Sequence, residues 1–222
     1  MSDSIDVILP CLNEAEALPA VLGALPEGYR ALVVDNGSTD ATAEVAKQLG
    51  ASVVTEPHRG YGAAVQAGVW HASSEVVAVL DADGSIPAAI LPVLAGEVLA
   101  GRADLAVGRR RPVAGSQPWH TRWGNAVLTW WVRRRGLPVH DIAPVRVTNR
   151  KALLALGVTD RAFGYPLELL VRAAAAGWTV AEVDVAYRQR LGGESKVSGS
   201  WRGTLRATRG MAGVVVRTWT HR

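Results

Sequence analysis

The sequence has little cysteine and no long apolar run, and both absences limit what the chain can be. Its one cysteine, Cys11, cannot form an internal disulfide, and no group of Cys and His residues has the spacing of a zinc site. No apolar stretch approaches the roughly 18 residues that a membrane-spanning helix needs. Asp3 and Asp6 stand where a secretory signal would carry basic residues. We therefore expect a protein of the cytoplasm without a bilayer-spanning segment.

Acidic residues are scarce in the second half of the chain. Residues 1–108 contain 4 Lys or Arg against 14 Asp or Glu, whereas residues 109–222 contain 20 against 6. Arginine and tryptophan are concentrated in residues 109–135 and 196–222. Such a mixture indicates binding to a nucleic acid, a membrane surface or a phosphorylated ligand. Because neither segment has a helix-turn-helix, zinc-finger or RNA-binding signature, we expect no nucleic acid partner.

Short apolar runs alternate with helical patterns through the first half. We expect strands at 5–9, 31–34, 52–55 and 76–80. The run at 76–80 is continuously apolar, which is typical of a strand covered on both faces. The alternation of these strands with helices predicts an α/β protein with a mainly parallel sheet. Beyond Gly108 the rhythm changes to a Trp-rich helix at about 119–135, further strands near 145–148 and 179–187, and a mobile loop at 191–200. We expect two lobes, 1–108 and 109–222, within one structural unit.

Carboxylates follow two of the predicted strands. Asp35 comes directly after the second run, and Asp81 and Asp83 come after the fourth. Parallel strands present their carboxyl ends at one edge of the sheet, where ligands bind in open α/β folds. Two carboxylates spaced by one residue can share a hard divalent cation, although aspartates also occur in turns for capping reasons.

An ordered set of motifs carries a family resemblance. It comprises Asn13-Glu14, Asp35-Asn36-Gly37-Ser38, Arg59-Gly60-Tyr61-Gly62, Asp81-Ala82-Asp83, Gly108-Arg109, Arg122 with Asn125, Asp141 with Arg146, Glu168, and Arg190 before Gly193-Glu194-Ser195-Lys196. The set resembles family-2 glycosyltransferases of the GT-A fold. Its order is similar to that of the polyprenyl-phosphate hexose synthases, the dolichol-phosphate mannosyltransferase group, over nearly the whole chain.

The resemblance implies a Rossmann-like GT-A fold, with a nucleotide-sugar-binding lobe at 1–108 and an acceptor-binding lobe at 109–222. The implied reaction moves a hexosyl group with inversion from a GDP or UDP sugar to a polyprenyl phosphate, with Mg²⁺ or Mn²⁺ on Asp81 and Asp83. The implied donor-binding residues are Pro10, Asn13, Glu14, Asp35, Gly37, Arg59, Gly60, Gly62, Asp81, Ala82 and Asp83. The implied catalytic residues are Asp83, Arg109, Arg122, Asp141, Glu168, Arg190 and Lys196. The family usually has Asp where this chain has Asn36, and some relatives place a metal-contacting side chain at the position of Ser85.

Other interpretations of these residues stay open at the level of sequence. Gly60 and Gly62 permit tight turns and close helix packing as well as ligand approach. Asp141 and Glu168 are either bases or structural partners of the surplus arginines. We expect Trp70 to pack in the core.

The acceptor is inferred from charge. An alcohol normally needs a carboxylate base, whereas a phosphate monoester, with a second pKa of about 6, is already largely dianionic at neutral pH. The many arginines favour this anionic acceptor, and the basic, Trp-rich segments suit a peripheral contact with the inner face of the cell membrane. The alternatives are a soluble acceptor for the same donor, or a non-catalytic nucleotide-binding or nucleic-acid-binding protein.

Overall fold

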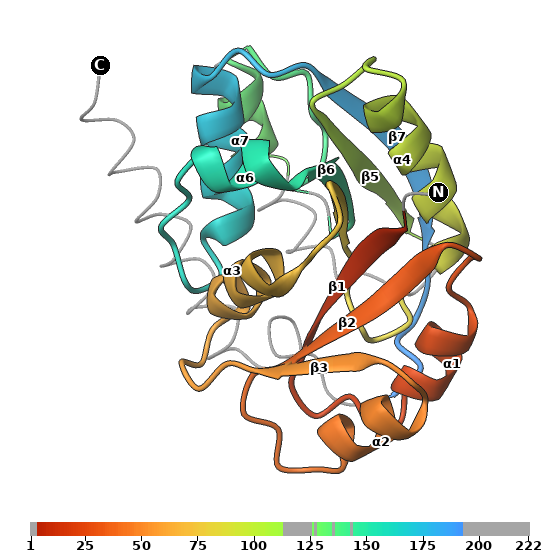
Figure 1. Ribbon diagram of the computed structural model, residues 1–222. Coiled ribbons are helices and arrows are strands. Elements are labelled where there is room, and N and C mark those ends of the chain that lie inside the picture. The colour runs from red at the N-terminus through yellow and green to blue at the C-terminus, as the bar shows by residue number, and fades with distance from the viewer. Residues whose placement is uncertain (1–3, 113–125, 127, 135, 143, 193–222) are drawn as a thin grey trace.

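The structure is a computed structural model that describes residues 4–112, 126, 128–134, 136–142 and 144–192. The described strands form one seven-stranded sheet with helices on both faces (Figure 1). The strands are β1 (Ile5–Cys11), β2 (Tyr29–Asp35), β3 (Ser52–Thr55), β4 (Val76–Val79), β5 (Leu105–Pro112), β6 (Arg146–Asn149) and β7 (Val180–Tyr187). The helices are α1 (Leu18–Gly23), α2 (Thr42–Gln48), α3 (Tyr61–His71), α4 (Leu91–Leu99), α6 (Arg150–Ala155) and α7 (Tyr165–Ala175), with a 3₁₀ turn at Ala88–Ile90.

The strand order is β3-β2-β1-β4-β6-β5-β7. β1 pairs in parallel with β2 and β4, β2 with β3, and β5 with β7, whereas β6 runs antiparallel to both β4 and β5. The prediction of a mainly parallel α/β sheet is therefore confirmed, with β6 as the reversed strand. The order changes direction between β1 and β4, and such a switch point is where open α/β sheets bind ligands.

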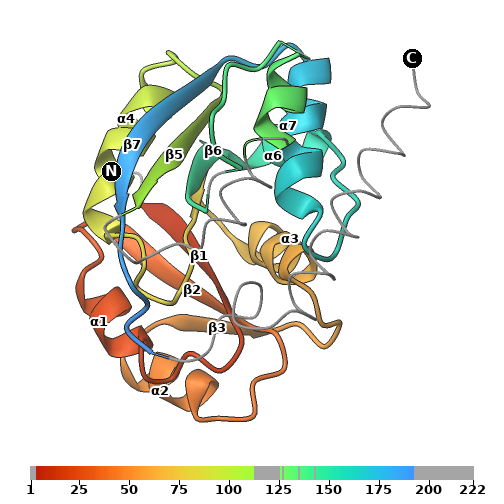
Figure 2. The same cartoon turned by 180° about the vertical axis from the view of Figure 1, so that it is seen from behind.

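Alternation along β1 explains the two layers of helices. Val7 and Leu9 pack in a buried cluster with residues of α1, α2 and α4, while Ile8 packs in another cluster with residues of α3, α6 and α7. The two opposite views in Figures 1 and 2 show α3, α6 and α7 on one side of the sheet and α1 and α4 on the other. The centre of the sheet is thus buried on both faces, as the continuously apolar run at 76–80 indicated.

The sheet continues across the predicted lobe boundary. β5 begins at Leu105 and ends at Pro112, so residue 108 lies within a strand, and β6 and β7 belong to the same sheet as β1 to β4. The division into a donor lobe and an acceptor lobe stays a prediction about function.

Two observations concern the surface and the membrane. The expectation that Trp70 packs in the core is wrong, because its side chain lies near the end of α3 with 70% of the residue surface exposed. Within the described residues, no helix has the length and apolarity that crossing a bilayer requires.

Candidate active site

Asp81 and Asp83 follow β4 at the switch point of the sheet. Asp83 accepts a hydrogen bond from the Ser85 backbone N–H through Oδ1 at 2.8 Å, and Asp81 accepts one from the Tyr61 hydroxyl at 3.5 Å. Burial raises the pKa of Asp81 to about 7, and the neighbouring charge of Asp83 adds to this rise against the opposing effect of nearby arginines. Two carboxylates held this close favour a cation between them.

The charges of three arginines, Arg110, Arg146 and Arg190, act on Asp81 and oppose the rise of its pKa. Arg190 follows β7 and joins two of the predicted donor-binding residues. Its Nη2 lies 2.7 Å from Glu14 Oε1, and its Nη1 lies 3.4 Å from Asp83 Oδ2. The Leu191 N–H donates to the Asp83 carbonyl at 2.9 Å, so the chain after β7 is fixed against the loop after β4.

Arg146 enters the site from β6. It is 3% exposed, and it donates from Nη1 to the Tyr61 hydroxyl at 3.1 Å and from Nη2 to the Ile142 carbonyl at 3.1 Å. Its buried Nε has no hydrogen-bond partner among the described residues. The reversed strand β6 therefore brings a buried positive charge to the carboxyl end of β4.

The sequence selected Arg109 for the site, but the structure favours Arg110. Arg109 lies 4.0 Å from Asp184, whereas Arg110 bonds to Asp141, lies over the Tyr187 ring at 5.5 Å from its centroid, and interacts with Asp81. Because β5 extends to Pro112, neighbouring arginines point to opposite faces, and the one after Gly108 is not the one at the site. The alternation of a strand continued past Gly108 was the signal that could have identified Arg110.

Asp141 and Glu168 are engaged in structural contacts. Asp141 accepts hydrogen bonds from the Arg110 backbone N–H, Nε and Nη2 at 2.7–2.8 Å, and Glu168 accepts bonds from Thr159, Asp160 and Arg172 at 2.7–3.2 Å. Burial opposes ionisation of both carboxyls, but these bonds outweigh it and lower both pKa values. These contacts are those expected of structural partners of arginines, and a catalytic role for either residue stays a prediction.

The loops after β1 and β2 are tied together. Asn13 has a φ of 58°; its N–H donates to Ser38 Oγ at 3.0 Å, and its side-chain oxygen accepts from the Thr39 N–H at 2.7 Å. Asp35 accepts from the Ser38 N–H at 3.0 Å. These bonds place the predicted donor-binding residues Asn13 and Asp35 at the same edge of the sheet as Asp81.

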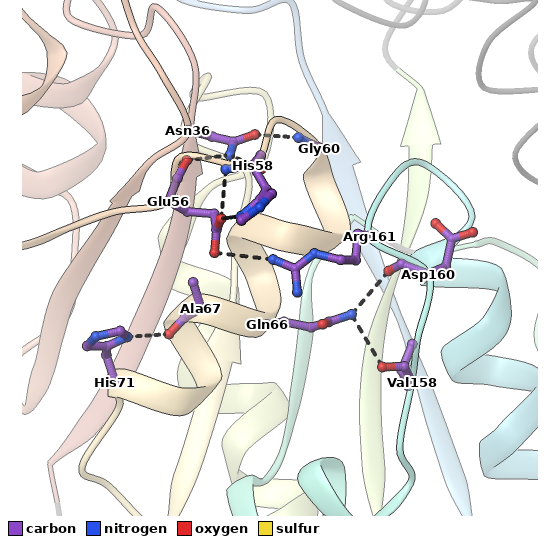
Figure 3. A network of polar contacts seen from close by, with 10 residues as sticks. All are labelled: Asn36, Glu56, His58, Gly60, Gln66, Ala67, His71, Val158, Asp160 and Arg161. Atoms are coloured by element: carbon purple, nitrogen blue, oxygen red, sulfur yellow. Dashed lines mark hydrogen bonds and ion pairs between the residues drawn. The ribbon is translucent and has the colours of Figure 1, made fainter.

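Asn36 holds the segment between β3 and α3 in place (Figure 3). Its Nδ2 donates to the carbonyls of Glu56 and His58 at 3.0 and 2.8 Å, and its Oδ1 accepts from the Gly60 N–H at 2.7 Å. An aspartate could not donate to the two carbonyls. The amide at this position is thus explained by the loop that it binds.

The glycines that precede and begin α3 have a packing role. A Cβ on Gly60 would lie 2.1 Å from the Arg161 carbonyl oxygen, and one on Gly62 would lie 2.2 Å from that of Asp160. The Gly62 N–H donates to the Ala162 carbonyl at 3.1 Å. Figure 3 shows that Gln66 of α3 also donates to the carbonyls of Val158 and Asp160, in the segment that the two glycines approach.

The other predicted site residues are placed as follows. Pro10 lies in β1, Gly37 has a φ of 85° and accepts a bond from Arg59 Nη2 at 3.1 Å, and Ala82 is buried between the two aspartates. Arg122 and Lys196 lie outside the described residues, as do most of the basic segments 109–135 and 196–222.

The model of glycosyl transferase family 2 matches residues 6–148, a span that includes the loops after β1, β2 and β4. The chain belongs to this family. An uncharacterized glycosyltransferase of Mycobacterium tuberculosis strain H37Rv is 63% identical over 205 residues, which cover 91% of this chain and 94% of the relative. The polyprenol monophosphomannose synthase of Mycolicibacterium smegmatis is 35% identical (87% of this chain, 81% of the relative), and the dolichyl-phosphate hexose transferase of Haloferax volcanii is 32% identical (86% and 85%).

Solved structures confirm the GT-A fold of this glycosyltransferase. Glucosyl-3-phosphoglycerate synthase from Mycobacterium tuberculosis, crystallised with Mn²⁺, UDP and glucosyl-3-phosphoglycerate, matches with a TM-score of 0.80 at 19% identity. The match covers 97% of this chain and 79% of that chain.

Proposed function

We propose that this glycosyltransferase is a metal-dependent, inverting enzyme that moves a hexosyl group from a nucleoside-diphosphate sugar to a polyprenyl phosphate. The observation that carries the proposal is the composition of the site. Arg190 lies 3.4 Å from Asp83, Arg146 bonds to the Tyr61 hydroxyl that donates to Asp81, and the charge of Arg110 acts on Asp81. Asp141 and Glu168, the two carboxylates that the sequence suggested as bases, are both held by other residues. Such a site suits an acceptor that is already an anion.

The residues at Asp81 and Asp83 fit a divalent cation. Burial, with the neighbouring charge of Asp83, raises the pKa of Asp81 to about 7, and a bound Mg²⁺ or Mn²⁺ would offset the repulsion between the two carboxylates. The cation would neutralise the diphosphate of the donor. Solved relatives of the same fold were crystallised with Mg²⁺ or Mn²⁺ and UDP, which supports this assignment.

In the proposed reaction an acceptor phosphate oxygen forms a bond to the anomeric carbon, and the bond from that carbon to the diphosphate breaks on the opposite side. The electron pair leaves with the nucleoside diphosphate, so its charge grows during the reaction. Arg110, Arg146 and Arg190 are placed to stabilise that charge and to orient the acceptor phosphate. No protein base is needed.

The names of two relatives support the lipid acceptor. One, 32% identical, is a dolichyl-phosphate hexose transferase, and the other, 35% identical, is a polyprenol monophosphomannose synthase. A peripheral contact with the cytoplasmic face of the membrane is part of the proposal. Trp130 is half-exposed, and Arg134 lies over its ring at 4.5 Å from the centroid. Such a pair suits the headgroup region of a bilayer.

A soluble phosphorylated acceptor is the second candidate. It is favoured by solved structures of the same fold that contain phosphoglyceric acid with UDP and Mn²⁺. This acceptor would use the same donor and the same aspartates.

A panel assay separates these candidates. The purified protein is incubated with GDP and UDP hexoses, with Mn²⁺ or Mg²⁺, and with either a polyprenyl phosphate or 3-phosphoglycerate, and products are identified by mass spectrometry. We expect a polyprenyl-phosphate hexose. Efficient glycosylation of 3-phosphoglycerate without a lipid product would select the second candidate, and no transfer from any donor would contradict both.

A further inference from the structure

Arg110 is held from several directions. Asp141 accepts from its Nε at 2.8 Å and from its Nη2 at 2.7 Å, which is a two-pronged ion pair, and also accepts from its backbone N–H at 2.8 Å. The Tyr187 ring packs against the guanidinium at 5.5 Å. Tyr187 is two residues beyond Val185, the register partner of Arg110, so both side chains lie on one face of the sheet.

Asp141 is itself held by a second carboxylate. Glu182 of β7 accepts from the Asp141 backbone N–H at 3.1 Å and from the His140 backbone N–H at 2.6 Å, both through Oε1. Glu182 is the register partner of Val107 in β5, and β7 lies beside β5 at the edge of the sheet (Figure 2). The loop that carries Asp141 is therefore anchored to the strand next to the one that carries Arg110.

This arrangement leaves one edge of the guanidinium available. Asp141 occupies the edge formed by Nε and Nη2, whereas Nη1 has no hydrogen bond to any described residue. Arg110 packs against Tyr187 near the end of β7, and the next residue, Arg188, donates its backbone N–H to the Ser85 carbonyl at 2.9 Å in the loop that carries Asp81 and Asp83. The guanidinium therefore lies near the site at the end of β4, which agrees with its charge acting on the pKa of Asp81. An arginine fixed through one edge offers the other to a ligand without first losing the freedom of a long side chain.

We propose that Asp141 is a positioning residue, which holds the Arg110 guanidinium so that its Nη1 edge meets the diphosphate of the donor, and that Glu182 holds Asp141 in turn. The proposal rests on the proposed function for the identity of the ligand. Asp141 acts only through Arg110 and touches no reacting atom.

The direction in which one substitution changes diphosphate affinity distinguishes a positioning role of Asp141 from a purely electrostatic one. Asp141→Asn removes a negative charge near an anion site, so simple electrostatics predicts that a diphosphate binds more tightly. Positioning predicts the opposite, because the neutral amide loses one strong acceptor and places an N–H near a guanidinium that only donates.

The experiment measures binding of inorganic pyrophosphate with Mn²⁺ by calorimetry, to the full chain and to Asp141→Asn, Arg110→Ala and the double variant. We expect about tenfold weaker binding for each single variant, the size of one charge-assisted hydrogen bond. The double variant should bind no more weakly than Arg110→Ala, because Asp141 has no effect once Arg110 is gone. Circular dichroism and thermal melting check that each variant is folded.

Asp184→Asn is the matched control. Asp184 of β7 pairs with Arg109 and Arg111, which flank Arg110 in β5 and lie on the opposite face of the sheet. This variant should bind pyrophosphate as the unchanged protein does. Unchanged or tighter binding by Asp141→Asn, or fully additive losses in the double variant, would overturn the positioning role alone. Failure of the unchanged protein to bind the probe would also remove the diphosphate site from the proposed function.

Discussion

In the proposed function, the donor site depends on Asp81 and Asp83. Replacing either with alanine should reduce transfer at least about a hundredfold, because the diphosphate loses the cation that neutralises it. EDTA should have the same effect and added Mn²⁺ should reverse it. Both side chains lie in the loop after β4 and not in the apolar core, so thermal melting should show that the variants remain folded. Activity that survives EDTA and both substitutions would contradict the metal site.

The raised pKa of Asp81 makes cation binding depend on pH. The group takes up a proton as the pH falls through about 7, and the proton competes with the cation. The affinity for Mn²⁺ should therefore fall about tenfold between pH 8 and pH 6, since a group with this pKa is mostly ionised at the first and mostly protonated at the second. Titration calorimetry without nucleotide measures this, and a constant affinity would contradict the assignment of Asp81.

Asn36 provides a separate test of the loop that precedes α3. Asn36→Asp loses the two donors to the Glu56 and His58 carbonyls and places a carboxylate against them. We expect the free energy of unfolding to fall by about 1–3 kcal/mol. Denaturant unfolding measures the change. A variant as stable as the unchanged protein would show that the loop does not need the amide.

At the scale of elements, the start of α3 depends on close approach to the 160–162 segment. Gly62→Ala places a methyl group 2.2 Å from the Asp160 carbonyl oxygen and 2.9 Å from Tyr165 Cβ, so backbone must move. We expect a loss of about 1–3 kcal/mol of stability. Gly96→Ala in α4 is the control, because nothing lies within 4 Å of its Cβ position. A helix-interior alanine there should add about 0.5–1 kcal/mol.

The elements also explain which site residues sequence could identify. Asn13, Asp35, Asp81 and Asp83 follow apolar runs whose ends are visible in the sequence, and parallel pairing brings such ends to one edge. Arg110 and Arg146 could not be selected this way. Their positions depend on how far β5 extends and on the reversal of β6, and both are set by long-range pairing.

At the scale of the whole molecule, the charge asymmetry predicts reversible attachment to membranes. The protein should float with vesicles that contain anionic lipid at low salt and dissociate at high salt, because each basic residue near an anionic surface contributes about 1 kcal/mol and salt screens it. Neutral vesicles are the control. Trp130→Ala combined with Arg134→Gln should weaken the attachment. Absence of binding at low salt would contradict the membrane contact.

The sequence by itself determined the fold class and the family, and it predicted the cation pair. These depend on local features: short apolar runs, helical patterns between them, and an ordered set of motifs at strand ends. Only the tertiary structure decided that Asp141 and Glu168 serve arginines, that Arg110 rather than Arg109 faces Asp81, and that Asn36 and Gly62 fix loops. The physical reason is that a charged side chain takes its role from its partners. Most of those partners come from distant positions once the sheet has formed: Arg110 and Asp141 are 31 positions apart and Arg190 and Glu14 are 176 apart, whereas Arg172 and Glu168 are 4 apart on α7.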